Sequence, residues 1–155
     1  FLEFTGSFNV NRVEDTDQVP LPDVLASLDE AYMSAGEVDE FENEKPQEKG
    51  IGTILYNYGN FQTNVQGRYL TGTTELIDTN PDVLQTFGSE WVWDLGVSYV
   101  FDNGLDVGIG AENIFDNYPG QTQEGFNFGG IFPWGTRIIG INGRRLYTTV
   151  RYTFD

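Results

Sequence analysis

The feature that most constrains this chain is a two-residue alternation of apolar and polar side chains, repeated in segments of roughly ten residues. One face of segment 91–101 carries Trp91, Trp93, Leu95, Val97, Tyr99 and Phe101. Because successive side chains of a strand point to opposite faces, this pattern predicts a strand with one apolar face. Five further segments are predicted as strands: 2–11, 50–58, 61–70, 105–115 and 144–154. Only for the glycine-rich segment 50–58 does the pattern not determine which side chains lie on the apolar face. The sequence therefore predicts an all-β chain.

The connections between these segments fall into two classes. Asn57–Asn60 and Asp102–Gly104 hold the Asn and Gly residues that tolerate positive φ, so each predicts a tight antiparallel hairpin. The other connections, 12–49, 71–90 and 116–143, are long. Since short and long connections alternate, all tight turns are expected at one end of the sheet and all long loops at the other.

A short surface helix is expected within the first long loop. Pro22 suits a first helical turn and Gly36 suits a helix end. The apolar stripe between them comprises Val24, Leu25, Leu28, Ala31 and Tyr32.

The charge of the chain is strongly acidic, with 24 acidic against 8 basic side chains and a net charge of -16. Half of the acidic residues lie between Glu14 and Glu48, where Lys45 is the only base. Such a segment repels phosphate backbones, so nucleic acid is excluded as a partner. Its carboxylates Asp39, Glu40, Glu42 and Glu44 are candidates for Ca²⁺ or for divalent bridges to lipopolysaccharide. They lack the spacing of a calcium loop, and a solvated acidic surface is expected instead.

Catalysis finds little support in the residue types. The chain has no Cys and no His, which removes thiolate chemistry, the commonest metal ligand and the commonest general base. A Gly-x-Ser-x-Gly nucleophile motif is also missing. We expect no enzymatic activity and no cofactor.

Alternating strands of this length fit either a β-sandwich or a transmembrane β-barrel. Strands of about ten residues match a tilted membrane strand, and short turns opposite long loops describe outer-membrane barrels. The pairs Trp91 with Trp93 and Tyr99 with Phe101 lie at opposite ends of one apolar face, as two interfacial aromatic girdles require. The sequence has no apolar run long enough for a membrane-spanning helix. These features favour the barrel.

Two stretches resemble the end of TonB-dependent outer-membrane receptors. The first, "LDVGIGAENIFDNYPG", ends a penultimate strand in the Asn-Ile-Phe-Asp motif Asn113, Ile114, Phe115 and Asp116. The second, "GINGRRLYTTVRYTF", opens on Gly-Arg and closes on an aromatic residue. Upstream, "NYGNFQTNVQGRYLTGT" is similar to the family's usual turn and strand.

The resemblance implies a barrel of about 22 strands in the bacterial outer membrane that imports a scarce nutrient, such as a siderophore, an oligosaccharide or a peptide. It implies as partners the rest of the barrel, a plug, the TonB complex, outer-membrane lipid and lipopolysaccharide. In the family the last strand is the recognition signal for the barrel-assembly machinery, which here corresponds to Thr148, Val150, Tyr152 and Phe154. Asp155 departs from the family, which usually stops at the aromatic residue.

Six strands leave two open edges, and each unpaired backbone group in hydrocarbon costs several kcal/mol. The chain also begins with Phe1 and carries no secretory signal. We therefore expect it to be the C-terminal part of a larger barrel, with the plug and the TonB box outside this sequence.

Two sets of side chains are candidates for contacts with cargo or plug. The last loop carries the aromatic residues Phe126, Phe128, Phe132 and Trp134, which either stack on cargo or pack on neighbouring loops and the plug. The lumen is expected to be lined by the charged residues Arg68, Asp94, Arg145 and Arg151. Two alternatives stay open: a secreted β-sandwich carbohydrate-binding module using Trp91, Trp93 and Trp134, and a passive outer-membrane porin.

Overall fold

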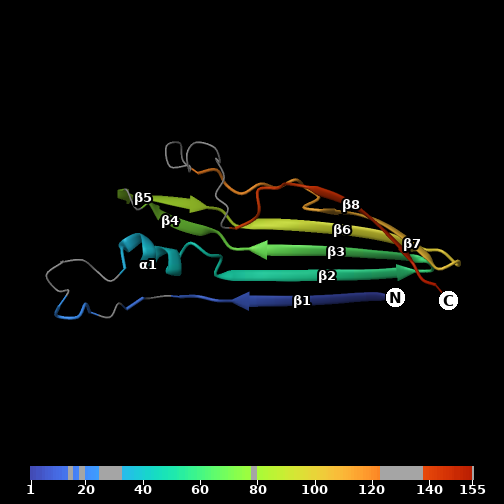
Figure 1. The fold of residues 1–155 in the computed structure, drawn as a ribbon, viewed down its shortest axis with the longest axis horizontal. Helices are drawn as coiled ribbons and strands as arrows, with labels where there is room; N and C mark the ends of the chain where they lie inside the picture. The colour runs from blue at the N-terminus through green and yellow to red at the C-terminus, as the bar shows by residue number, and fades with distance from the viewer. Residues whose placement is uncertain (14–15, 18–19, 25–32, 78–79, 123–137, 155) are drawn as a thin grey trace.

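The chain forms two antiparallel sheets and one helix in a computed structural model that describes residues 1–13, 16–17, 20–24, 33–77, 80–122 and 138–154 (Figure 1). The larger sheet has six strands in the order β1-β2-β3-β6-β7-β8. They are β1 Leu2–Val10, β2 Glu48–Tyr58, β3 Phe61–Leu70, β6 Glu90–Val100, β7 Leu105–Glu112 and β8 Arg145–Tyr152. The smaller sheet pairs β4 Thr73–Ile77 with β5 Asn80–Phe87, and helix α1 spans Ala35–Glu42. The predicted antiparallel all-β class is confirmed, and the large sheet is open.

The two ends of the large sheet differ as the connections predict. Gly59, with φ of 56°, and Gly104, with φ of 81°, make the tight turns of the β2–β3 and β6–β7 hairpins. We call this end the turn end; both chain termini lie there (Figure 1). The opposite end, which we call the loop end, carries α1 and the β4–β5 hairpin (Figure 1).

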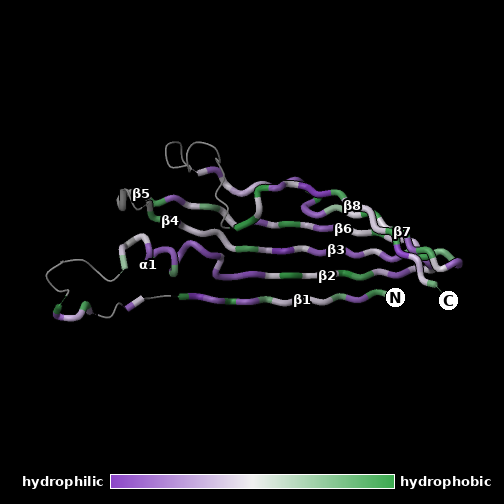
Figure 2. Tube along the Cα trace, in the orientation of Figure 1, coloured by the Kyte–Doolittle hydropathy of each residue, from purple (hydrophilic) through white to green (hydrophobic). Residues whose placement is uncertain are grey.

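The register of the ladders places all the apolar strand faces on one side of the sheet. A row that crosses all six strands consists of Phe4, Ile54, Val65, Leu95, Ala111 and Leu146. Hydrophobic and hydrophilic residues alternate along the strands (Figure 2). The register also settles the facing of β2, because Ile54 and Tyr56 pair with apolar-face residues of β1. We call this side the apolar face and the other the polar face.

Some boundaries differ from the prediction. Strand β7 ends at Glu112 rather than Phe115, because Asn113 adopts a φ of 50° and leaves the extended region. Strand β8 ends at Tyr152. The predicted loop 71–90 contains the β4–β5 hairpin, which sequence analysis missed. Pro81 within β5 weakens its strand signal, and the pairing shifts register between Leu76 and Ile77.

The first long loop contains a short helix, at residues beyond the predicted apolar stripe. Residues 25–32, which hold most of the expected apolar stripe, lie outside the described residues. Helix α1 begins after Ser34, and Gly36 lies in its first turn rather than at a helix end. Ser34 and Glu37 form a capping box, the Ser-x-x-Glu signal that sequence analysis overlooked. In the part of the chain that the structure describes, no helix is both long and apolar enough to cross a membrane.

Helix α1 is joined to the β4–β5 hairpin through Asp39. Its carboxylate accepts hydrogen bonds of 2.7 Å from the Leu76 amide and from the Asn43 side chain. Asp39 and Glu44 are buried, at 7% and 5% exposure. The expectation of a solvated acidic surface is therefore wrong for these two residues, since Asp39 serves as a structural acceptor between two long loops.

The small hydrophobic core lies at the loop end. It comprises Phe87, Val92, Ile138 and Ile139, with Leu70 packed against it. Leu70 and Val92 lie on the polar face of the large sheet, as their register with Lys49 and Arg68 requires. The segments after β4 and β7 thus fold over the polar face at the loop end.

Replacing Asp39 by Ala removes the acceptor of the Leu76 amide. Because a hydrogen bond to a charged group contributes about 1.5–3 kcal/mol, we expect the protection of this amide against hydrogen exchange to fall about ten- to a hundredfold. Glu40→Ala removes an exposed carboxylate of the same helix and should leave the protection unchanged. Equal effects of both substitutions would mean that net charge, not the Asp39 bond, holds the helix.

Candidate functional site

Aromatic side chains gather at both ends of the apolar face. At the loop end, the Trp91 ring lies 4.9 Å from Tyr69 and 5.8 Å from Trp93, centroid to centroid. At the turn end, Tyr99 contacts Phe61 at 4.8 Å and Phe101 at 4.7 Å. The predicted girdle residues therefore lie in two separate aromatic clusters.

The middle of the apolar face is aliphatic and open. Ile109 is 65% exposed and Val150 is 69% exposed, although both lie on the face that carries the hydrophobic residues. Among the described elements, no strand or helix covers this face. An exposed apolar face of this extent requires an apolar surrounding or a partner.

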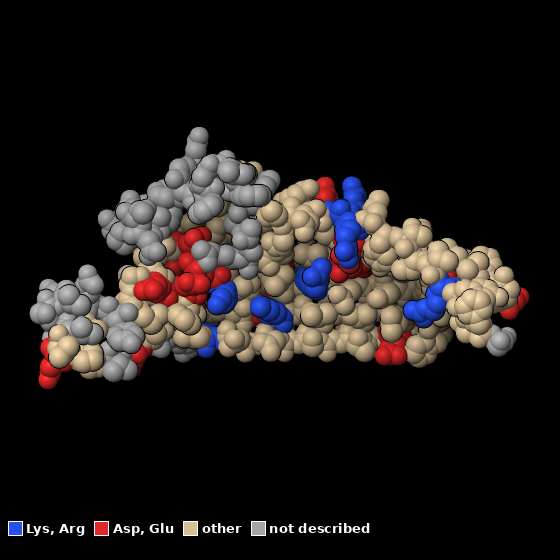
Figure 3. All heavy atoms as spheres, viewed as in Figure 1, with Lys and Arg blue, Asp and Glu red and all other residues tan. Residues whose placement is uncertain are grey.

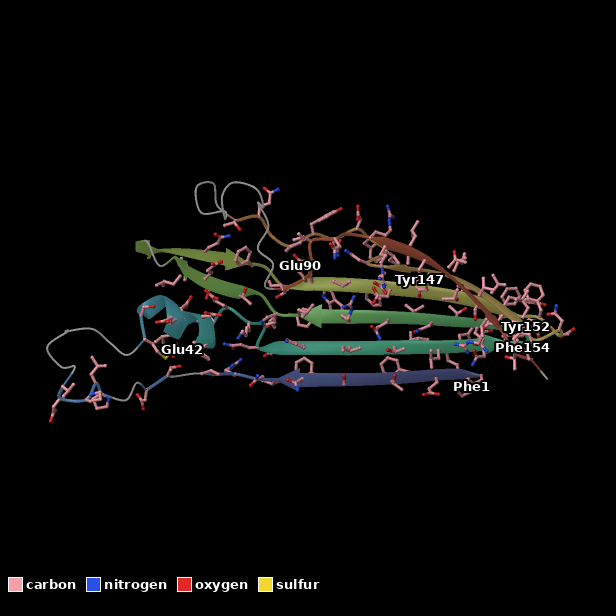
Figure 4. All side chains as sticks on the ribbon, in the orientation of Figure 1. Phe1, Glu42, Glu90, Tyr147, Tyr152 and Phe154 are labelled. Carbon is pink, nitrogen blue, oxygen red and sulfur yellow. The ribbon has the colours of Figure 1, made fainter. Side chains whose placement is uncertain are left out.

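The residues proposed as an assembly signal lie at the open edge. Thr148, Val150 and Tyr152 are exposed on the apolar face of β8. Tyr152 contacts Phe154, which lies just beyond the strand, with ring centroids 4.8 Å apart. In Figure 4 both aromatic side chains lie at the turn end.

The polar face carries the four charged residues that were predicted to line the lumen. Arg68 and Asp94 form an ion pair of 3.1 Å between β3 and β6. Arg145 pairs instead with Glu112 of β7, a partner that the sequence did not indicate. Arg151 lies opposite Asp106 in the β7–β8 register, and the buried Oδ1 atom of Asp106 has no hydrogen-bond partner. Figure 3 shows Lys and Arg along the sheet, whereas Asp and Glu gather toward the loop end.

Hydrogen bonds join the end of β7 to β6 and to the residue before β8. They are made by the motif Asn113, Ile114, Phe115 and Asp116. The Asn113 amide donates to Asp94 Oδ1 at 2.9 Å, and the Ile114 amide donates to the Trp93 carbonyl at 2.8 Å. Asp116 Oδ1 accepts the Arg144 amide at 2.7 Å, which ties the motif to the residue before β8.

Residues Asn113 and Asp116 both have positive φ, of 50° and 58°. Asn and Asp tolerate this conformation better than other residues with side chains. Phe115 is exposed. The motif therefore acts in this structure as a strand terminator.

A hollow of about 280 Å³ lies on the polar face near the loop end, beneath Ile138 and Ile139. Its polar lining includes Lys49, Arg68, Glu112, Asn113 and Asn142. A second hollow of about 360 Å³ lies nearer the turn end. It is lined by Asn57, Gln62, Asn64, Ser98, Tyr147 and Thr149, among others. Among the residues named for the first hollow, sequence analysis predicted Arg68 as lumen-facing and Asn113 as part of a family motif. It predicted no site role for the residues named for the second hollow.

Tyr147 lies over glycines on the polar face. A Cβ atom at Gly110 would collide with the Tyr147 ring, and one at Gly96 would lie 3.2 Å from its hydroxyl. The tyrosine ring therefore lies over Gly110 and its hydroxyl lies close to Gly96, in the part of the sheet where Figure 4 labels Tyr147. Glycine at position 110 is required by this close approach.

The aromatic residues of the last loop, Phe126, Phe128, Phe132 and Trp134, lie outside the described residues, as does Asp155. Within the described ranges, no group of three or more acidic residues is arranged to hold a metal ion. No protein-family model, curated protein or solved structure matches this chain.

Replacing Asp94 by Ala leaves the Asn113 amide and the Arg68 guanidinium without their acceptor. We expect a loss of about 1.5–3 kcal/mol in the free energy of unfolding, mainly from the Asn113 amide because the exposed part of Arg68 is screened by solvent. The loss is measured as a shift of the urea midpoint at unchanged slope. Asp106→Ala, which removes a polar-face carboxylate with an unpartnered oxygen, is the matched control and should cost less. A larger loss for Asp106 would contradict this account.

Proposed function

We propose that this chain forms part of the wall and loop cap of a transmembrane β-barrel that imports a scarce nutrient across a bacterial outer membrane, in the manner of a TonB-dependent receptor. The observation that carries the proposal is the single apolar face across six antiparallel strands, with aromatic clusters at both ends. Strands β2, β3 and β6 have 11, 10 and 11 residues, which matches the length of a tilted membrane strand.

The two open edges support a larger barrel. Strands β1 and β8 each have one neighbour in the large sheet, so one side of each backbone is unpaired there. In hydrocarbon each unpaired group costs several kcal/mol, so further strands must complete the ladders. A barrel of about 22 strands with a plug is the proposed whole.

The polar face is proposed as the lumen wall. Outer-membrane barrels are polar inside, and charged residues there pair with one another as Arg68 and Asp94 do. The loop-end segments fold over this face and leave the 280 Å³ hollow beside Lys49, Arg68 and Glu112. This hollow is the proposed point where cargo or plug touches the wall.

The negative charge at the loop end bears on which class of cargo is imported. The acidic residues at the loop end repel anions, which favours neutral or cationic cargo over anionic ferric siderophores. Energy coupling is assigned to the plug and to TonB, and membrane insertion through β8 to the barrel-assembly machinery.

The carbohydrate-binding alternative is less well supported. The Trp93 ring would meet a Cβ atom on Gly67 at 2.7 Å, so it lies against the sheet rather than standing free as a sugar platform. A β-sandwich also needs a second sheet over the apolar face. The β4–β5 sheet packs with α1 instead.

The first test is membrane fractionation followed by the intact mass of the polypeptide extracted in detergent. We expect a protein of the outer-membrane fraction with a mass several times the 17.4 kDa of this chain. Recovery without detergent would overturn the barrel and favour the sandwich. Uptake that persists after the proton gradient is dissipated would favour a passive porin over a TonB-dependent receptor.

The facing of the sheet is tested by placing one charge on each side of the same strand. Val97→Arg puts a cation near the middle of the apolar face and should cost about 2–4 kcal/mol of barrel stability in lipid vesicles. Ser98→Arg changes the next residue of β6 and so puts the same cation on the polar face of the sheet, where it should cost much less. Equal costs in urea titrations of the two variants would contradict the assignment of lipid and lumen faces.

A further inference from the structure

Three glycines lie in one row on the apolar face. Gly6 of β1 pairs with Gly52 of β2, and Gly52 pairs with Gly67 of β3. The row ends at Trp93 of β6, which is the partner of Gly67. Three adjacent strands therefore lack side chains at the same level of the face.

The glycine row forms the floor of a hollow of about 520 Å³. Its walls are aromatic and aliphatic side chains: Phe4, Phe8, Ile54, Val65, Tyr69, Trp91 and Trp93. Among the described residues that line it, none is charged and Ser7 is the only one with an aliphatic hydroxyl group. The volume lies in the range of small-molecule sites, and the lining suits an apolar ligand.

Packing explains only one of the three glycines. A Cβ atom at Gly67 would collide with the Trp93 ring at 2.7 Å. At Gly6 and Gly52 a Cβ atom would come no closer than 3.5 Å and 3.7 Å to its neighbours, and neither residue has positive φ. Glycine in a strand interior weakens the strand, and it often marks a site where a ligand or another backbone approaches closely.

We propose that this glycine-floored hollow binds one acyl chain of a membrane lipid. The inference rests on the proposed function, because it requires the apolar face to lie in hydrocarbon. The Tyr69–Trp91 pair borders the hollow on its loop-end side. Tyr and Trp of membrane proteins are enriched at the level of the lipid headgroups. A lipid whose headgroup lies beside these rings places its acyl chain directly over Gly52, and the uncharged lining fits that chain.

The test is photolabelling of the full-length protein in vesicles of phosphatidylethanolamine that carries a diazirine on one acyl chain. Labelled peptides are mapped by mass spectrometry. In the wild-type protein we expect label concentrated on the hollow residues, above the level on the rest of the apolar face. Gly52→Leu fills the hollow and should lower this label to that general level. Thr63→Leu enlarges a residue of the same face outside the hollow and should leave the label unchanged.

The outcomes separate the two proposals. Even labelling over the whole apolar face of the wild-type protein overturns the acyl-chain site but leaves the membrane assignment intact. An unlabelled hollow within a labelled face also overturns it and points to a protein segment as the occupant. Absence of label from the entire apolar face overturns both proposals. If Gly52→Leu fails to fold, Gly6→Leu replaces it, and label that persists in the folded variant overturns the site.

Discussion

The continuous hydrogen-bonded register of the six-stranded sheet is the constraint on which the other features depend. Because side chains alternate with a period of two, a slip of one residue between two strands would move a whole set of apolar residues to the other face. The row from Phe4 through Leu95 to Leu146 exists only in the observed register. The same register brings Arg68 beside Asp94 and aligns Gly6 with Gly52.

The loop end is organised by buried polar contacts that the strand pattern does not contain. Asp39 joins helix α1 to β4, and Gln85 of β5 donates to the Gln121 carbonyl of the following long connection. These bonds link the three long connections to one another, and the Phe87 and Ile138 cluster fixes them over the polar face. The sheet thus has one open side, which is apolar, and one partly covered side, which is polar.

The sequence predicted the strands well and the long connections poorly. Segments such as 61–70 and 91–101 were recognisable because alternation is repeated many times within each. Helix α1 was missed because an apolar stripe, most of which lies outside the described residues, was preferred over the short Ser34–Glu37 capping signal. In the candidate site, Arg68 and Asp94 were predicted on one face, but Glu112 as the partner of Arg145 could not be found without the pairing of β7 with β8.

What the sequence determined by itself is the facing of five of the six strands of the large sheet and the placing of tight turns at one end. Both are local properties, set by the two-residue repeat and by glycines at positive φ such as Gly59 and Gly104. Tertiary structure decided which residues become neighbours: the facing of β2, the Asp94 contacts, the burial of Asp39 and the alignment of Gly6, Gly52 and Gly67. These depend on ladders and loop contacts between residues far apart in the chain, whose register follows from many hydrogen bonds formed together rather than from any one segment.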